Sequence, residues 1–140
     1  MAVKVVADSA SDLPADLAES LGIAVVPCNV NFGTETYRDG VDLSADEFYR
    51  RLMDGPVHPT TSQPSVGEFL QTYDRVGVDT DGIVSVHVSS RVSGTYNSAV
   101  QASAQSSAGC PIEVVDSAQA SMGIGMIAMA AARAAAGGAD

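Results

Sequence analysis

Two short stretches of the sequence carry many side-chain hydroxyl groups. Residues 58–69 read HPTTSQPSVGEF and contain no Lys or Arg, and residues 89–99 read SSRVSGTYNSA. Serine and threonine hydroxyls, together with the free backbone N–H groups at the start of a helix, can hold a small anion without a basic side chain. The two stretches therefore indicate a binding site for a ligand with a small anionic head group.

The hydroxyls in these stretches differ in their expected local tasks. Ser65 and Glu68 form an S-x-x-E capping box, so Ser65 is expected at the start of a helix. Ser93 is expected to cap the next helix, and that task alone would explain a serine at this position. Thr61 has no such local task, which makes it the residue of the first stretch that most favours a binding role.

Three aspartates indicate a different chemistry. Asp8 and Asp116 each end a predicted strand, and Asp12 follows Asp8 by four residues. Carboxylates at neighbouring strand ends can hold Mg²⁺, so a Mg²⁺-dependent phosphoryl-transfer enzyme using these residues is an alternative hypothesis. The P-loop, the G-x-S-x-G elbow and a glycine-rich turn after the first strand are all missing, which disfavours the enzymes built on them. His87, inside a predicted strand, is expected to be a half-buried structural residue.

The elements that must position these residues alternate between strands and helices. Apolar, β-branched runs predict strands at 3–7, 23–32, 82–88 and 111–116, with a bend or an edge at Pro27 and a short return strand within 33–40. Capping patterns predict helices that begin near Asp12, Ser44, Ser65 and Ser93, and a last helix is predicted from about Ala120 to Ala136. This alternation predicts an α/β fold with a mostly parallel sheet flanked by helices. Ligands of such folds bind at the carboxyl ends of the strands, where we expect both hydroxyl stretches.

Composition and charge exclude several classes of partner. The chain has 140 residues, a net charge of −10 and a single lysine, so binding to nucleic acid or to anionic membrane surfaces is not expected. The longest apolar run, residues 122–132, is too short to cross a bilayer, and the N-terminus reads as a strand rather than a signal peptide. Cys28 and Cys110 lack metal or redox spacing. We expect a cytoplasmic protein with reduced thiols.

Six segments, spread in order along the chain, resemble the DegV family of bacterial lipid-binding proteins. They are DSASDLP (8–14), VVPCNVNF (25–32), YRDG (37–40), TTSQPS (60–65), SSRVSGTYNSA (89–99) and VVDS (114–117). The resemblance implies a protein that binds a long-chain fatty acid, without catalysis or cofactor of its own. It also implies that Thr61 and Ser93 hydrogen-bond the fatty-acid carboxylate, with Ser62 beside Thr61 as an assisting hydroxyl.

The resemblance carries two further expectations. Some members of the family are the lipid-holding subunit of a two-part fatty acid kinase and present the carboxylate to a separate ATP-using subunit. Family members also carry a second domain, with the acyl tail largely between the two, so residues 1–140 are expected to form a single α/β domain that corresponds to the N-terminal one. An interaction domain that binds no ligand is the remaining alternative.

Overall fold

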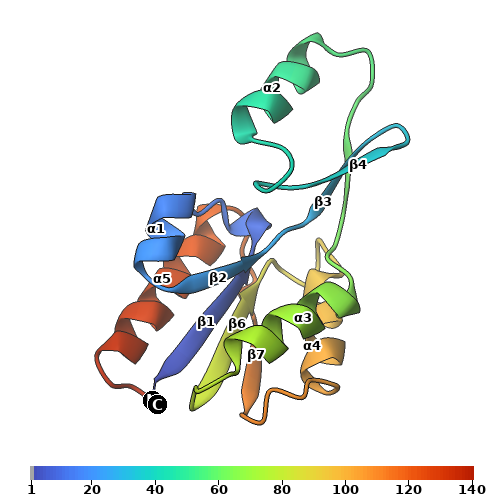
Figure 1. Cartoon of the computed structure of the whole chain (residues 1–140). Helices are drawn as coiled ribbons and strands as arrows, with labels where there is room; N and C mark the ends of the chain where they lie inside the picture. The colour runs from blue at the N-terminus through green and yellow to red at the C-terminus, as the bar shows by residue number, and fades with distance from the viewer. Residues whose placement is uncertain (1) are drawn as a thin grey trace.

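A four-stranded parallel sheet forms the centre of the computed structural model, which describes residues 2–140 (Figure 1). Its strands are β1 (Val3–Asp8), β2 (Ile23–Val26), β6 (Gly82–His87) and β7 (Ile112–Asp116). They lie in the order β2-β1-β6-β7, and each adjacent pair is parallel. The predicted parallel sheet is thereby confirmed, and β1 and β6 occupy its interior.

Helices cover both faces of this sheet, as the α/β prediction requires. α1 (Ala15–Ser20) and α5 (Met122–Ala136) lie on one face, and α3 (Val66–Val76) and α4 (Thr95–Ser103) lie on the other. The alternation of side chains along β1 divides the core, because successive residues of a strand point to opposite faces. Val5 and Ala7 pack with α1 and α5, whereas Val6 packs with α3 and α4. Among residues 2–140, no helix has the length and apolarity needed to cross a membrane.

The sequence of α5 allows it to lie very close to the loop that follows β1. A Cβ atom at Gly125 would lie 2.9 Å from the carbonyl oxygen of Ser11, a separation that real Cβ atoms do not reach. Gly125 is buried together with Ala128 and Ala132, so α5 turns a face of small residues toward the sheet. This close approach fixes the position of the β1 loop.

A small lobe projects from the parallel sheet (Figure 1). It consists of β3 (Asn29–Phe32), β4 (Glu35–Arg38), α2 (Ala45–Asp54) and β5 (Thr60–Ser62), and its sheet is antiparallel in the order β4-β3-β5. The prediction of one strand over 23–32 is wrong, because the chain leaves the parallel sheet at Pro27 and its second half pairs elsewhere. The return strand predicted within 33–40 is β4, whereas β5 was not predicted.

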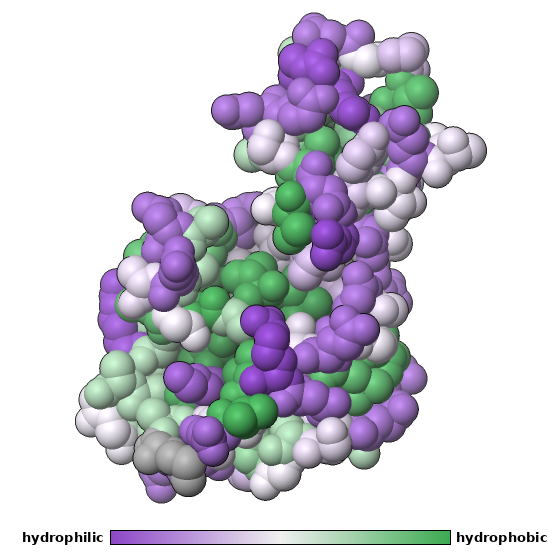
Figure 2. Space-filling view, in the orientation of Figure 1, coloured by the Kyte–Doolittle hydropathy of each residue, from purple (hydrophilic) through white to green (hydrophobic). Residues whose placement is uncertain are grey.

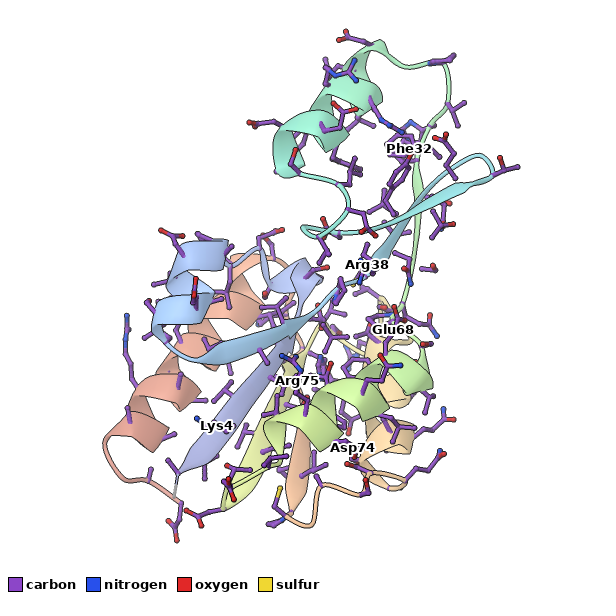
Figure 3. All side chains as sticks on the ribbon, viewed as in Figure 1. Lys4, Phe32, Arg38, Glu68, Asp74 and Arg75 are labelled. Atoms are coloured by element: carbon purple, nitrogen blue, oxygen red, sulfur yellow. The ribbon has the colours of Figure 1, made fainter. Side chains whose placement is uncertain are left out.

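The lobe has its own apolar centre, which Figure 3 shows around Phe32. Val30, Phe32 and Leu43 are buried there. The guanidinium of Arg51 lies 5.4 Å from the ring centre of Phe32 and 4.9 Å from that of Tyr37. These contacts hold β3 and β4 against α2, and β3 in turn pairs with β5, which carries Thr61.

Helix caps agree with the sequence at two of the predicted sites. Ser65 Oγ accepts from the N–H of Glu68, and the Glu68 carboxylate accepts from the N–H of Ser65, so the predicted capping box is confirmed. Ser44 Oγ caps α2 by accepting from the N–H of Glu47, but the Glu47 carboxylate accepts from Arg50 and Arg51 and does not close a box. The prediction for Asp12 is wrong, because it takes a left-handed conformation with φ of 51° and α1 begins only at Ala15.

Candidate functional site

The two hydroxyl stretches meet at one cleft of about 510 Å³. Thr61, Ser62 and Ser93, the three site residues predicted from the sequence, all belong to its wall. The rest of the wall comes from the β1 loop, from the β2–β3 connection, from the base of the lobe and from the β6–α4 loop: Ser9, Ala10, Asp12, Cys28, Val30, Asp39, Gln63, Val88, Val92, Gly94 and Thr95. The convergence of the two stretches therefore depends on how the lobe is placed against the parallel sheet.

Thr61 reaches the cleft from the antiparallel sheet and not from the start of α3, as the sequence had indicated. In the register of β3 and β5, Thr61 lies opposite Val30, and Val30 also lines the cleft. Residues paired across antiparallel strands share a face of the sheet, so this register directs Thr61 toward the cleft. Ser62 lies opposite Asn29, and its Cβ starts on the other face. Thr61 is therefore the better placed of the two hydroxyls.

Ser93 lies in the loop between β6 and α4, at the carboxyl end of the parallel sheet as predicted. Its role as helix cap is a wrong prediction, because the N-cap of α4 is Gly94. Ser93 Oγ accepts from the backbone N–H of Thr95 at 3.2 Å and lies 2.9 Å from Thr95 Oγ1. The Ser93 side chain is half-buried, and the Thr95 side chain is fully buried.

Gly94 joins the two hydroxyl stretches by direct contact. A Cβ atom at this position would lie 2.5 Å from Nε2 of Gln63, the residue that follows Thr61 and Ser62. Any larger residue here would have to displace the Gln63 side chain. The glycine thus lets the TSQPS and SGTY segments pack against each other.

The cleft holds one thiol, which is not a nucleophile at neutral pH. Burial raises the pKa of Cys28 to about 11. The Cys28 backbone N–H donates to Ser9 Oγ at 2.9 Å, which ties the β1 loop to the connection between β2 and β3. The polar groups that the cleft offers to a ligand near pH 7 are therefore hydroxyls, backbone groups, the Gln63 amide and the carboxyl groups of Asp12 and Asp39.

The three aspartates of the magnesium hypothesis each accept hydrogen bonds from a different set of groups. Asp8 is fully buried, the Asp12 carboxylate accepts from Ser121 Oγ at 2.6 Å, and the Asp116 carboxylate accepts from Ser90. The Ser90 hydroxyl is the main cause of the lowered pKa of Asp116. Among residues 2–140, no group of three or more acidic, His or Cys side chains is arranged to hold a metal ion. The geometry therefore gives the phosphoryl-transfer hypothesis no support.

A chain of buried polar groups, the buried relay, lies beneath the cleft. The Tyr73 hydroxyl donates to Ser85 Oγ at 2.8 Å, Ser85 Oγ lies 2.6 Å from His87 Nε2, and His87 Nδ1 lies 2.9 Å from Asp8 Oδ2. All four side chains are fully buried, so the expectation that His87 is half-buried is wrong. Asp8 also accepts from the N–H groups of Ala10 and Val88, two residues of the cleft wall.

The buried relay has the Ser-His-Asp order of a hydrolase but not its accessibility. Neither Ser85 nor His87 lines the cleft, and the Ser85 oxygen already accepts a hydrogen bond from Tyr73. Only a weak sequence signal points to this network, namely polar residues at two alternate positions of an otherwise apolar strand. Its function in the structure is to connect the ends of β1 and β6 under the cleft.

A second cleft, of about 760 Å³, adjoins the first and is mainly apolar. The two share Ser9, Asp12 and Asp39 as a common wall. Its apolar wall comes from the β1 loop, α1, β2 and the lobe: Leu13, Pro14, Ala15, Ala18, Ile23, Val25, Pro27, Val41, Ala45 and Tyr49. Figure 2 shows apolar surface gathered in this hollow between α1 and the lobe. Sequence reasoning did not find it, since its walls come from segments whose packing the sequence does not specify.

Comparison with known proteins places this geometry in context. A model of the DegV family matches residues 2–140. A DegV domain-containing protein of Caldanaerobacter subterraneus subsp. tengcongensis is 40% identical over 138 residues, which are 99% of this chain and 49% of that protein. The chain thus spans about half the length of the curated relatives it matches.

Solved structures of similar proteins share the fold. A DegV family protein from Thermus thermophilus, described for its fatty acid binding, superposes with a TM-score of 0.89 at 36% identity. The match covers 100% of this chain and 49% of the Thermus chain. DegV of Bacillus subtilis, described as a fatty acid binding protein, has a TM-score of 0.91 at 34% identity, with 99% and 49% covered. A stearic acid-binding protein from Eubacterium ventriosum has a TM-score of 0.89 at 32% identity, with the same coverage.

Proposed function

Because the chain belongs to the DegV family, we propose that it takes part in binding a long-chain fatty acid, whose carboxylate is held by Thr61 and Ser93 with Ser62 assisting. One observation carries this proposal: a cleft rich in hydroxyls shares a wall with a larger apolar cleft. A fatty acid has the same two parts, a small anionic head and a long apolar tail. The solved relatives described as fatty acid binding proteins support the same ligand class.

The carboxylate is expected at the end of the polar cleft that Thr61 and Ser93 form. An ionised carboxylate only accepts hydrogen bonds, and both hydroxyls can donate. The first turn of α4 adds backbone N–H groups and the positive end of the helix dipole. Asp12 and Asp39, in the wall shared by the two clefts, repel an anion from the junction and so favour this end.

The tail is expected to extend along the apolar cleft and to supply most of the affinity. Both clefts have volumes in the range of ligand pockets, roughly 300–1,000 Å³. Burying a tail of about 15 CH₂ groups gains on the order of 12 kcal/mol before ordering costs, at about 0.8 kcal/mol per group. Each hydrogen bond to the carboxylate adds only about 1.5–3 kcal/mol. The hydroxyls therefore fix the orientation of the lipid rather than its overall affinity.

The proposed role is to hold the lipid and not to transform it. The cleft thiol is protonated near pH 7, and the sequence has no P-loop. Converting the held carboxylate to an acyl phosphate would therefore need a separate ATP-using subunit. Presentation of the carboxylate to such a fatty acid kinase subunit is the second part of the proposal.

Titration of two variants with a fatty acid and with its methyl ester tests the head-group assignment. Thr61→Val and Ser93→Ala should each weaken binding of the acid by about 5- to 150-fold, because a charged acceptor loses one donor. The neutral ester should respond much less. Thr60→Val is the matched control, since Thr60 is an exposed residue of the same strand that does not line the cleft.

The outcomes separate the hypotheses. Equal losses for acid and ester would mean that the hydroxyls shape the cleft without contacting the carboxylate. Mass spectrometry of lipid extracted from the purified protein tests the ligand class itself. Absence of both co-purifying lipid and binding would favour an interaction domain, and Mg²⁺-dependent turnover would favour the phosphoryl-transfer enzyme.

A further inference from the structure

We propose that Thr95 is a positioning residue that holds the Ser93 hydroxyl as a hydrogen-bond donor, so that the Thr61–Ser93 end of the cleft selects head groups that accept hydrogen bonds. The inference rests on the proposed function, since it concerns the same cleft. It adds a buried residue that acts through Ser93, and it explains why the ligand class is an acceptor. The carrying observation is that the backbone N–H and the hydroxyl of one buried residue both lie within hydrogen-bond distance of a single serine oxygen.

Thr95 is the first residue of α4, and its side chain is fully buried. Its backbone N–H donates to Ser93 Oγ at 3.2 Å, and its own Oγ1 lies 2.9 Å from the same oxygen. The direction of the first bond is fixed, because a backbone N–H can only donate. The direction of the second bond decides what Ser93 offers to the cleft.

The burial of Thr95 settles that direction. Among residues 2–140, Ser93 Oγ is the only hydrogen-bond partner of Thr95 Oγ1, and no face of Thr95 is open to solvent. If Ser93 donated to Thr95, the Thr95 hydroxyl hydrogen would be a buried donor without an acceptor. That arrangement is disfavoured by about 5- to 150-fold in population, which is the usual penalty for an unpaired buried donor. Thr95 therefore donates, and Ser93 accepts.

The consequence for the ligand follows from the capacity of a hydroxyl, which has one hydrogen and two acceptor positions. Both acceptor positions of Ser93 Oγ are filled by Thr95, and its hydrogen is left for the cleft. Ser93 can therefore donate to a carboxylate but cannot accept from a donor head group. Thr61 differs, because its exposed hydroxyl is free to rotate and does not discriminate in this way.

Two probes with the same alkyl chain test the selection: a fatty acid, whose ionised head only accepts, and a primary alkylamine, whose ammonium head only donates. Thr95→Val keeps the shape of the side chain and removes its hydroxyl donor, which frees one acceptor position on Ser93. Binding of the acid should weaken by about 3- to 10-fold, as for one lost neutral hydrogen bond, while the amine should bind as well as before or better. Thr95→Ser restores the hydroxyl and should restore the wild-type acid-to-amine ratio.

A double-mutant cycle separates this role from a purely structural one. In the Ser93→Ala background, Thr95→Val should leave the acid-to-amine ratio unchanged, because the oxygen that Thr95 orients is absent. If the wild type binds the acid but Thr95→Val alone leaves the ratio unchanged, the inference about Thr95 is wrong and the proposed function stands. If Thr95→Ser fails to restore the ratio, the methyl group and not the hydroxyl sets it, which also overturns the inference. If the wild type does not bind the acid at all, the proposed function itself fails.

Discussion

The buried relay under the cleft and the hydroxyl cluster on the cleft wall are made of similar polar side chains in opposite settings. In the relay, formed by Tyr73, Ser85, His87 and Asp8, each side-chain donor has an acceptor and no member reaches solvent. In the cluster, formed by Thr61, Ser62, Ser93 and Thr95, two members are exposed and one is half-buried. The cluster therefore keeps hydroxyl donors that can bond a ligand, whereas every side-chain donor of the relay is already paired within the protein.

This difference separates a structural role from a binding role more reliably than residue type does. A buried polar group without a partner costs about 1–3 kcal/mol, so a buried network persists when it is satisfied from within. A hydroxyl at the wall of a cleft is satisfied by water until a ligand replaces it. Substitutions in the relay should therefore lower the free energy of unfolding and leave the relative affinities for different ligands unchanged. Substitutions in the cluster should change those relative affinities.

The largest effect is expected from Asp8→Ala, which removes the acceptor of three hydrogen bonds. His87 Nδ1 and the Val88 N–H would lose their partner in the protein interior, and the Ala10 N–H would lose its partner at the partly buried cleft wall. We expect the free energy of unfolding to fall by about 3–5 kcal/mol, as for other broken buried polar pairs. Urea denaturation measures this change.

The matched control for Asp8→Ala is Asp16→Ala, which removes an exposed carboxylate in the first turn of α1. It should cost no more than about 1 kcal/mol. In the folded fraction of Asp8→Ala, the ratio of affinities for a fatty acid and its methyl ester should stay as in the wild type. A changed ratio would mean that the relay also contributes to reading the head group, and the comparison would fail.

A smaller effect is expected at the other end of the relay. Tyr73→Phe keeps the ring and removes one hydrogen bond, so it should cost about 1 kcal/mol near pH 7. Burial raises the pKa of Tyr73 to about 12, above its ordinary value of 10.0. The folded state thus favours the protonated phenol, and this contribution is fully present below pH 10 and is lost as pH rises through about 12.

The pH dependence gives the Tyr73 prediction its sharpest measurement. The free energy of unfolding of the wild type should fall between about pH 10 and pH 12 more steeply than that of Tyr73→Phe, by the equivalent of one proton. Tyr49→Phe is the control, because Tyr49 is 60% exposed. If the free energy of unfolding of the wild type and of Tyr73→Phe falls equally steeply between about pH 10 and pH 12, burial does not raise the pKa of the Tyr73 phenol.

Much of the parallel fold could be predicted from the sequence, because its signals are local. Apolar β-branched runs predicted the positions of β1, β6 and β7, and the S-x-x-E pattern predicted the cap of α3. The hydroxyl stretches also predicted one shared cleft, although the route by which Thr61 reaches it was wrong. The strands and the helix cap depend on residues that are neighbours along the chain, whereas the shared cleft also depends on the placement of the lobe.

The rest depends on contacts that no local pattern encodes. β5 has three residues, too few for a periodic signal, and it exists because β3 pairs with it. The relay joins Asp8 to His87 across the sheet, and its completeness follows from tertiary packing. The apolar cleft depends on where the lobe lies after the chain turns at Pro27, which a bend signal does not specify.

The smallest expected effect belongs to Asp39, which lines both clefts and places a negative charge near the proposed carboxylate. Asp39→Asn keeps the shape of the side chain and removes that charge. Binding of a fatty acid should tighten by about 2- to 5-fold at low ionic strength, and less in high salt, because the repulsion is screened. The affinity for the methyl ester should be unchanged, and the free energy of unfolding should stay within about 0.5 kcal/mol of the wild type.

Asp46→Asn serves as the control, since it removes an equal charge from an exposed position in the first turn of α2. If the acid and the ester tighten equally, Asp39 acts on the shape of the cleft. If the acid alone weakens, Asp39 orients a donor for the carboxylate, and the placement of the head group at the Thr61–Ser93 end would have to be revised.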